Sequence, residues 1–211
     1  MLIQARRQRG FSLVEMMVVI ALLGILFAAA IPAVGAWSAD SKLRSAAESF
    51  TNGVRLAQAT AVGRNRITVM ALTSGTPAYT STPAADSANW MVLVDPLSTE
   101  TLDSSYLIQT STQARQNGVA VTGPALVCFN SFGQMTTTLT TALGTATCKS
   151  AGGNDAANAT STQGTTGAVV SYQLTRTGSK RKYRVLVYGG GRVRMCDALK
   201  TLSTTDPDGC P

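Results

Sequence analysis

The sequence predicts an α+β protein in which one long N-terminal helix is followed by a β-rich domain. The 24 residues from Met16 to Ala39 carry no charge, which suits a helix in an apolar environment. Apolar residues then recur every three or four positions as far as Ala61, the period of an amphipathic helix. Later in the chain, short β-like runs alternate with stretches that contain Gly, Ser and Pro, as in a domain built from strands.

The composition excludes several classes of function. The 211 residues include no histidine, which removes Ser-His-Asp and Cys-His catalysis and every His-based metal site. Asp95, Glu100 and Asp103 are clustered carboxylates around a turn with no partner base. The glycines at 189–191 belong to no phosphate-binding motif. We therefore expect no enzyme activity, catalytic residue, cofactor or metal.

The N-terminal segment combines a basic start with an apolar run. Arginines precede the run, which indicates a cytoplasmic start, and the run exceeds the ~20 residues that span a bilayer as a helix. A cleaved secretory signal would have a shorter apolar core followed by a small-residue cleavage site. We expect a membrane-spanning segment over residues 13–37. A plain signal anchor is the alternative, but it gives no reason for Glu15.

Glu15 lies close to this apolar run, where a carboxylate costs a few kcal/mol unless it finds a partner. Cleavage between Gly10 and Phe11 would supply one, because the new α-amine at Phe11 lies close to Glu15 along one helix face. The two charges can then neutralise each other, within one subunit or between neighbours.

The stretch RGFSLVEMMVVIALLGILFAAAIP resembles the prepilin leader of type IV pilins and type II secretion pseudopilins, with matches at Gly10, Phe11, Glu15 and Pro32. The resemblance implies that residues 1–10 are a leader removed by a prepilin peptidase and that Phe11 is N-methylated. It implies that Glu15 helps to recruit the subunit to a growing filament. It also implies a single-pass protein of the bacterial inner membrane with its C-terminal domain in the periplasm, later moved into an extracellular pilus or a periplasmic pseudopilus.

The helix is expected over residues 11–63, ending near Gly63, with a kink or loosening at Pro32 because proline lacks a backbone donor. Its second half should pack on a sheet. The face expected to be buried consists of Trp37, Leu43, Ala46, Ala47, Phe50, Val54, Ala57 and Ala61.

Residues 64–211 are expected to form the β-rich globular domain. Strands are predicted at 66–72, 90–95, 101–110, 125–130, 168–174, 182–188 and 192–196, with loops at 73–89 and 136–167. The segments VLVDP, VCFNSFGQ and GGGRVRMC resemble the GspH/FimT group of minor pilins and pseudopilins. That resemblance implies a long N-terminal helix packed on a two-sheet C-terminal domain.

The four cysteines form no CxxC pair. Their even number indicates two disulfides in an oxidising compartment. Four cysteines allow three pairings. We favour the local one, which would staple the base of the long polar loop and tie down the polar C-terminal tail. It joins Cys128 to Cys148 and Cys196 to Cys210.

A basic stretch without any acid runs from residue 174 to 195. Lys182 and Arg184 alternate with apolar residues, so that one side of a hairpin can face the core while the other is wet. The YGGG sequence supplies the turn. Arg192 and Arg194 should share an exposed strand face, and with Gly191 they resemble the GRxR motif reported as a DNA-binding feature in some FimT-type pilins.

The expected function is that of a minor type IV pilin that supports pilus assembly, at or near the pilus tip. One alternative is a DNA-binding pilin for uptake in natural transformation, with Arg192, Arg194, Lys182 and Arg184 on DNA phosphates. A minor pseudopilin of a type II secretion system is the other alternative. The expected partners are other pilins through the N-terminal helix, the prepilin peptidase and the inner membrane, with DNA added only in the first alternative.

Overall fold

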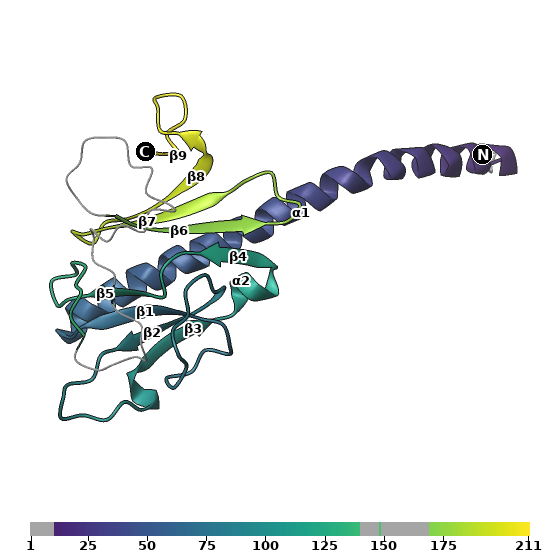
Figure 1. The fold of residues 1–211 in the computed structure, drawn as a ribbon. Helices are drawn as coiled ribbons and strands as arrows, with labels where there is room; N and C mark the ends of the chain where they lie inside the picture. Colours follow the sequence, from purple (N-terminus) through teal and green to yellow (C-terminus); the bar gives the residue numbers. More distant parts are fainter. Residues whose placement is uncertain (1–10, 140–147, 149–168) are drawn as a thin grey trace, which may run out of the picture.

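The structure, a computed structural model, describes residues 11–139, 148 and 169–211, with the backbone alone at residues 29–33. In this part of the chain a long helix, α1 (Leu13–Arg64), projects from a domain of two β-sheets (Figure 1). The first sheet has the order β3-β2-β1-β5 and the second β4-β6-β7-β8-β9. Their strands are β1 (Thr68–Thr73), β2 (Asn89–Val94), β3 (Leu107–Ser111), β4 (Val119–Thr122), β5 (Leu126–Phe129), β6 (Val169–Arg176), β7 (Tyr183–Tyr188), β8 (Val193–Thr201) and β9 (Gly209–Cys210). Two short helices, η1 (Ser104–Tyr106) and α2 (Gln113–Gln116), flank β3.

Both ends of α1 have side chains or backbone suited to capping. Ser12 is the N-cap, and its hydroxyl accepts a hydrogen bond from the Glu15 backbone N–H at 3.2 Å. At the other end the helix continues through Gly63 to Arg64, and Asn65 takes the left-handed conformation with φ 52°. The expected end near Gly63 is therefore off by one residue, because asparagine also tolerates this conformation and supplies the cap.

The middle of α1 was expected to kink at Pro32. The helical assignment is continuous from Leu13 to Arg64, but the side chain of Pro32 lies outside the described residues. Within the described residues, no helix combines the length and apolar character that a membrane crossing requires. The span expected over 13–37 includes residues 29–33 and stays a prediction.

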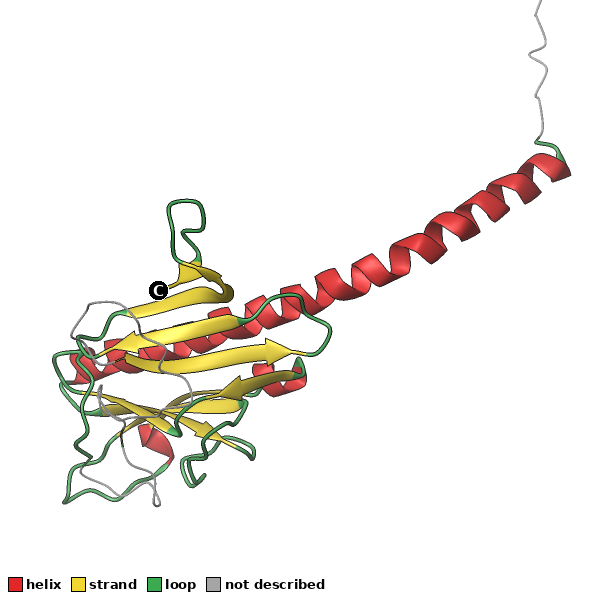
Figure 2. Ribbon diagram, turned by 45° about the horizontal axis from the view of Figure 1, so that its top comes forward, coloured by secondary structure: helices red, strands yellow, loops and turns green. Residues whose placement is uncertain are grey.

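The second half of α1 packs against both sheets and joins them in one core (Figure 2). Leu43, Phe50 and Val54 are fully buried there, together with the alanines of the predicted face. The Phe50 and Tyr172 rings lie 4.9 Å apart, which connects the helix to β6. Trp37 is the exception: it is 73% exposed, because burial of α1 begins only at Ala39. The expectation that Trp37 belongs to the buried face is wrong.

The first sheet is covered on both faces. All six residues of β1 and all six of β2 are buried. One face packs on α1, and the other forms a second apolar cluster that includes Met91, Leu126 and Cys128. Burial on both sides explains why β2 reads as an almost continuous apolar run rather than as an alternating one.

The predicted strands overlap seven of the nine in the described part of the chain, while β4 and β9 were not predicted. β4 has only four residues and lies at a sheet edge, where the alternation is too short to stand out. β9 has two residues, beside a disulfide. The first half of the 101–110 run forms η1 instead of strand, because the Asp103 carboxylate accepts from the Ser105 N–H at 2.7 Å. Most of the 136–167 loop lies outside the described residues.

Candidate functional site

The first candidate site is the start of α1. Gly10 lies outside the described residues. Phe11 is 79% exposed, and Glu15 lies in the first turn of α1. Ser12 and Glu15 have the spacing of a capping box, in which the side chain at one position bonds the backbone at the other. A carboxylate at this end also interacts favourably with the helix dipole. The sequence analysis pairs Glu15 with the Phe11 amine, within one subunit or between neighbours, and does not use the Ser-x-x-Glu capping signal that is also present.

The helix around Glu15 presents apolar side chains outward. Every described side chain from residue 11 to 28 is exposed, and the projecting part of α1 touches neither sheet in Figure 1. The large apolar members of this surface are Phe11, Leu13, Val14, Met16, Met17, Val18, Val19, Ile20, Leu22, Leu23, Ile25, Leu26 and Phe27. We call residues 11–28, the exposed start of α1 with the two residues before it, the free half of α1. An apolar surface of this extent is a site of interaction with lipid or with other proteins.

The second candidate site is the β7–β8 hairpin. Its inner face forms as predicted, but its outer face is not wet throughout, because Leu186 is buried there in a small cluster with Cys196 and Cys210. Tyr183, Val185 and Val187 are buried in the core, while Lys182 is exposed on the opposite side. The turn follows Tyr188, and its Gly191 has φ 88° and lies against the carbonyl of Gly133. Any other residue at this position would be strained at this φ, and its Cβ would clash with that carbonyl.

The four basic residues predicted to contact DNA differ in their surroundings. Arg192 is exposed, with its guanidinium carbon 4.2 Å from the centre of the Tyr188 ring. Arg194 is half-buried, and its Nη2 donates to the carbonyl oxygens of Pro207 and Gly209, both at 3.1 Å. The expectation that both arginines are exposed is therefore wrong for Arg194. Arg184 is half-buried with a buried Nε that has no hydrogen-bond partner in the described structure.

These contacts give the basic residues of the hairpin a structural role. Nη2 of Arg194 is occupied by two carbonyls of the C-terminal tail, which lie 13 and 15 residues away and which no strand pattern predicts. Of the four residues, only Lys182 and Arg192 are exposed.

Both predicted disulfides are present in the structure. Cys128 and Cys148 are bonded with their Cα atoms 5.6 Å apart, and Cys196 and Cys210 with theirs 5.1 Å apart. The tail closed by the second bond is also held by Lys200. Its ammonium lies 3.1 Å from the nearest carboxylate oxygens of two tail aspartates, Asp206 and Asp208, and these bonds raise the pKa of Lys200.

The carboxylates of Glu100 and Asp103 act in local structure. Glu100 binds Arg66 at 2.6 Å, and this bond, helped by the Leu97 backbone N–H, lowers the pKa of Glu100 to about 2. Arg66 Nη2 also donates to the Asp95 carbonyl at 3.0 Å, so the loop is fastened to the residues that follow α1. Asp103 caps η1 instead of joining this pair. In the described ranges no cluster of three or more His, Cys, Asp or Glu side chains has a geometry that could hold a metal.

A further contact, unpredicted from the sequence, fixes the β6–β7 loop to α1. The Asp40 carboxylate accepts from the Ser179 hydroxyl at 2.6 Å and from the Lys180 N–H at 2.9 Å. These bonds, with the Ser179 bond the largest, lower the pKa of Asp40. The partners are 139 and 140 residues apart, so no local signal marks the contact.

Comparisons with known proteins address the N-terminus directly. The family model described as the prokaryotic N-terminal methylation motif matches residues 5–31. No curated protein matches the chain. Two crystal forms of the type IV minor pilin FimU from Pseudomonas aeruginosa (strain PAO1) are similar in structure. The form in space group P21 has 10% identity and a TM-score of 0.43, covering 74% of this chain and 88% of FimU. The form in space group P65 has 9% identity and a TM-score of 0.41, covering 72% and 90%.

The matched segment contains the residues on which the leader prediction depends, Gly10, Phe11 and Glu15. The structure adds a helix that begins just after the expected cleavage site and a two-sheet domain behind it. The N-terminal segment of this chain is therefore a prokaryotic N-terminal methylation motif, which confirms the prepilin-type leader predicted from the sequence.

Proposed function

We propose that this chain is a minor type IV pilin that supports pilus assembly. It enters the inner membrane as a prepilin, is cleaved after Gly10 and methylated at Phe11, and is then incorporated into the filament. The methylation motif at residues 5–31 supports the processing steps. The expected position at or near the pilus tip rests on the GspH/FimT resemblance alone.

The observation that carries the proposal is the exposed free half of α1. Its apolar side chains pack on neither sheet, so they need a cover outside the subunit. Lipid supplies that cover before assembly, and the corresponding helices of neighbouring pilins supply it in the filament. Glu15 is the one charged residue among residues 11–28, and a carboxylate moved among apolar helices needs a neutralising partner. The methylated amine of a neighbouring Phe11 provides one.

DNA uptake is a weaker candidate. The GRVR match remains, and Arg192 is free to meet a phosphate. Arg194, its expected partner in the motif, is bonded to two backbone carbonyls, and Arg184 is half-buried. A bidentate Arg–phosphate contact by Arg194 would require these bonds to break first.

A secretion pseudopilin would share the leader, so the test must separate pilus from secretion. A strain lacking this chain should lose or reduce its surface pili, and the wild-type chain should restore them, while type II secretion remains normal. The Gly10→Val form should keep its leader in a mass measurement and should restore nothing. Normal piliation of the deletion strain, with a loss of secretion, would contradict the pilus assignment.

A further inference from the structure

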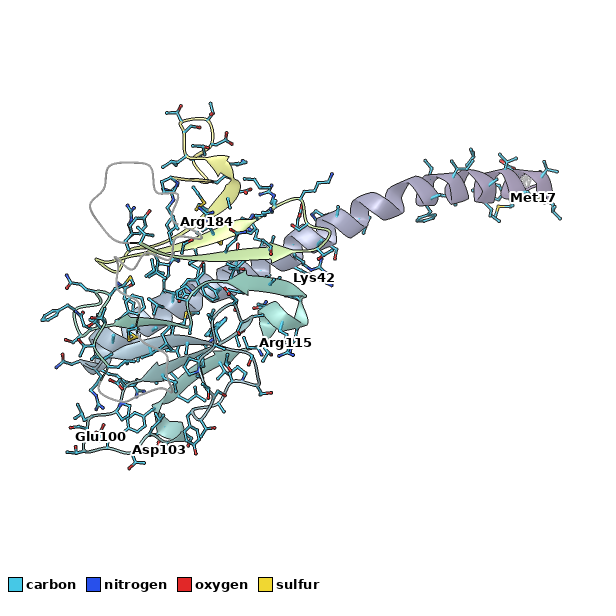
Figure 3. All side chains as sticks on the ribbon, in the orientation of Figure 1. Met17, Lys42, Glu100, Asp103, Arg115 and Arg184 are labelled. Atoms are coloured by element: carbon cyan, nitrogen blue, oxygen red, sulfur yellow. A yellow bond between two sulfur atoms is a disulfide. The ribbon has the colours of Figure 1, made fainter. Side chains whose placement is uncertain are left out.

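A group of basic residues lies on and beside α1 where the helix leaves the globular domain. We call it the basic collar, and it consists of Lys42, Arg44, Lys180, Arg181 and Lys182. The first two are exposed on α1, and the other three follow Ser179 in the β6–β7 loop. The Asp40 bonds to Ser179 and Lys180 fix this loop against the helix, and Figure 1 shows the loop beside α1 at that point. Figure 3 shows Lys42 there, on the side of the domain from which the free half projects.

The collar has an excess of positive charge. Its five bases face two acids on the same part of α1, Asp40 and Glu48. Two more acids, Asp197 and Asp208, act electrostatically on Arg181, which leaves five bases against four acids. Glu48 is already paired with Arg44 at 2.8 Å. The three lysines are exposed, and within the described residues their ammonium groups have no carboxylate partner. The acidic residues Glu100 and Asp103 lie at a distant part of the domain (Figure 3). The collar therefore attracts anions.

An exposed tryptophan lies next to the collar on its N-terminal side. Trp37 precedes the first buried residue of α1, Ala39, and is 73% exposed. At about 1.5 Å per residue, ~36 Å of helix separates Leu13 from Trp37 and ~43 Å separates Leu13 from Lys42. The bilayer has a hydrocarbon core of ~30 Å and measures ~40–45 Å with its headgroups. A helix that enters the membrane near Leu13 brings Trp37 to the far interface and the collar to the headgroups.

We propose that the basic collar and Trp37 form a seat for anionic phospholipid headgroups on the periplasmic leaflet, which holds the subunit upright before assembly. This rests on the proposed function, because it requires an inserted prepilin. Tryptophan is enriched at membrane interfaces, and Lys and Arg side chains near an anionic surface are attracted to its phosphates. The seat explains why basic residues follow the apolar segment as well as precede it. Duplex DNA offers the same phosphate chemistry, but the collar of an inserted subunit faces the bilayer.

The test uses the full-length chain in vesicles of phosphatidylcholine with about 30% phosphatidylglycerol. This anionic fraction gives the vesicle a negative surface potential on the order of tens of millivolts. Resistance to alkaline carbonate first establishes insertion. Quenching of Trp37 by spin-labelled phosphatidylglycerol is then compared with quenching by spin-labelled phosphatidylcholine. A Trp37→Phe form supplies the background from the buried Trp90. The collar variant carries three changes, Lys42→Gln, Lys180→Gln and Lys182→Gln.

A matched control variant removes the same charge from exposed residues outside the collar. It carries Arg55→Gln, Arg64→Gln and Arg192→Gln. For the wild-type chain we expect phosphatidylglycerol to associate at Trp37 at least about fivefold more strongly than phosphatidylcholine, because each nearby cation adds to the attraction. The preference should fall towards one in the collar variant and at high salt, and it should survive in the control variant.

Several outcomes would overturn the seat. Equal quenching by both lipids in carbonate-resistant vesicles would refute it while leaving the proposed function intact. Equal loss of preference in the collar and control variants would show that net charge, not the collar, selects the lipid. Trp37 quenched by aqueous iodide as strongly in vesicles as in free solution would place it away from the interface. Extraction of the chain by carbonate would reject the seat together with the membrane-inserted prepilin. Collar-dependent binding of a short duplex, without lipid preference, would make the collar a nucleic-acid surface instead.

Discussion

Replacing Arg194 by glutamine should destabilise the domain, because this side chain connects β8 to the C-terminal tail. Its Nη2 donates to the carbonyls of Pro207 and Gly209, which lie within three residues of Cys210 and its disulfide to β8. The arginine and the disulfide therefore hold the same short segment from two points. Without the guanidinium, the tail keeps the covalent tie but loses the contact that fixes its carbonyls.

The size of the effect follows from the two bonds and their exposure. A hydrogen bond to a charged group contributes about 1.5–3 kcal/mol when it is well buried. Arg194 is half-buried, and water or the new amide can satisfy part of what is lost. We therefore expect a loss of about 1–2 kcal/mol in the free energy of unfolding. Arg192→Gln is the control: its exposed contact with Tyr188 predicts a loss of only about 0.5 kcal/mol.

Urea unfolding of the full-length chain in detergent measures both variants, followed by the emission of the buried Trp90. Arg194→Gln should lower the midpoint more than Arg192→Gln does, with an unchanged slope. Equal stability of the two variants would refute the structural role of Arg194. If Arg194→Gln also left stability at the wild-type value but abolished duplex binding, the phosphate-binding role expected from the sequence would be restored.

Two further predictions concern packing and pH. Gly53→Ala should lower the free energy of unfolding by about 1–2 kcal/mol despite the better helix propensity of alanine, because its Cβ would lie 2.7 Å from Cη2 of the buried Trp90. Gly63→Ala is the control: its Cβ meets open space, so the change should be neutral or stabilising by up to about 1 kcal/mol. Equal stability of the two variants in urea unfolding would contradict the close packing at Gly53. Because the bond to Arg66 lowers the folded pKa of Glu100 from 4.5 to about 2, its contribution is present above the unfolded pKa and is lost as pH falls from about 4.5 to about 2. Glu100→Gln should flatten this part of the stability–pH curve, and an unaltered curve would show that the pair does not contribute.

The sequence predicts what depends on local pattern. The buried stripe of α1 follows from spacing, and the alternation of β7 follows from Tyr183, Val185 and Val187. Both disulfides join cysteines that are close in sequence, 20 and 14 residues apart, so locality was a sufficient guide.

What escaped prediction depends on where distant segments meet. Trp37 continues the apolar spacing, but the domain ends before it, and spacing does not say where a sheet stops. The occupied fork of Arg194 depends on the path of the tail, which its polar sequence leaves open. The Asp40–Ser179 contact joins the helix to a loop 139 residues later, and a short polar motif there is indistinguishable from any other turn.

The role of the free half of α1 in assembly is tested most directly by the amount of Glu15→Ala protein in the sheared pilus fraction. A matched control exists on the same helix: Glu48 is exposed and forms an ion pair with Arg44, four residues earlier. We expect the Glu15→Ala chain to be cleaved after Gly10 and to reach the membrane. It should nevertheless be depleted at least about tenfold from pili, equivalent to about 1.4 kcal/mol, which is within the cost of an unmatched charge among apolar helices. Glu48→Ala should be incorporated normally. Incorporation of Glu15→Ala at the level of Glu48→Ala would contradict the claim that this carboxylate registers one subunit against the next.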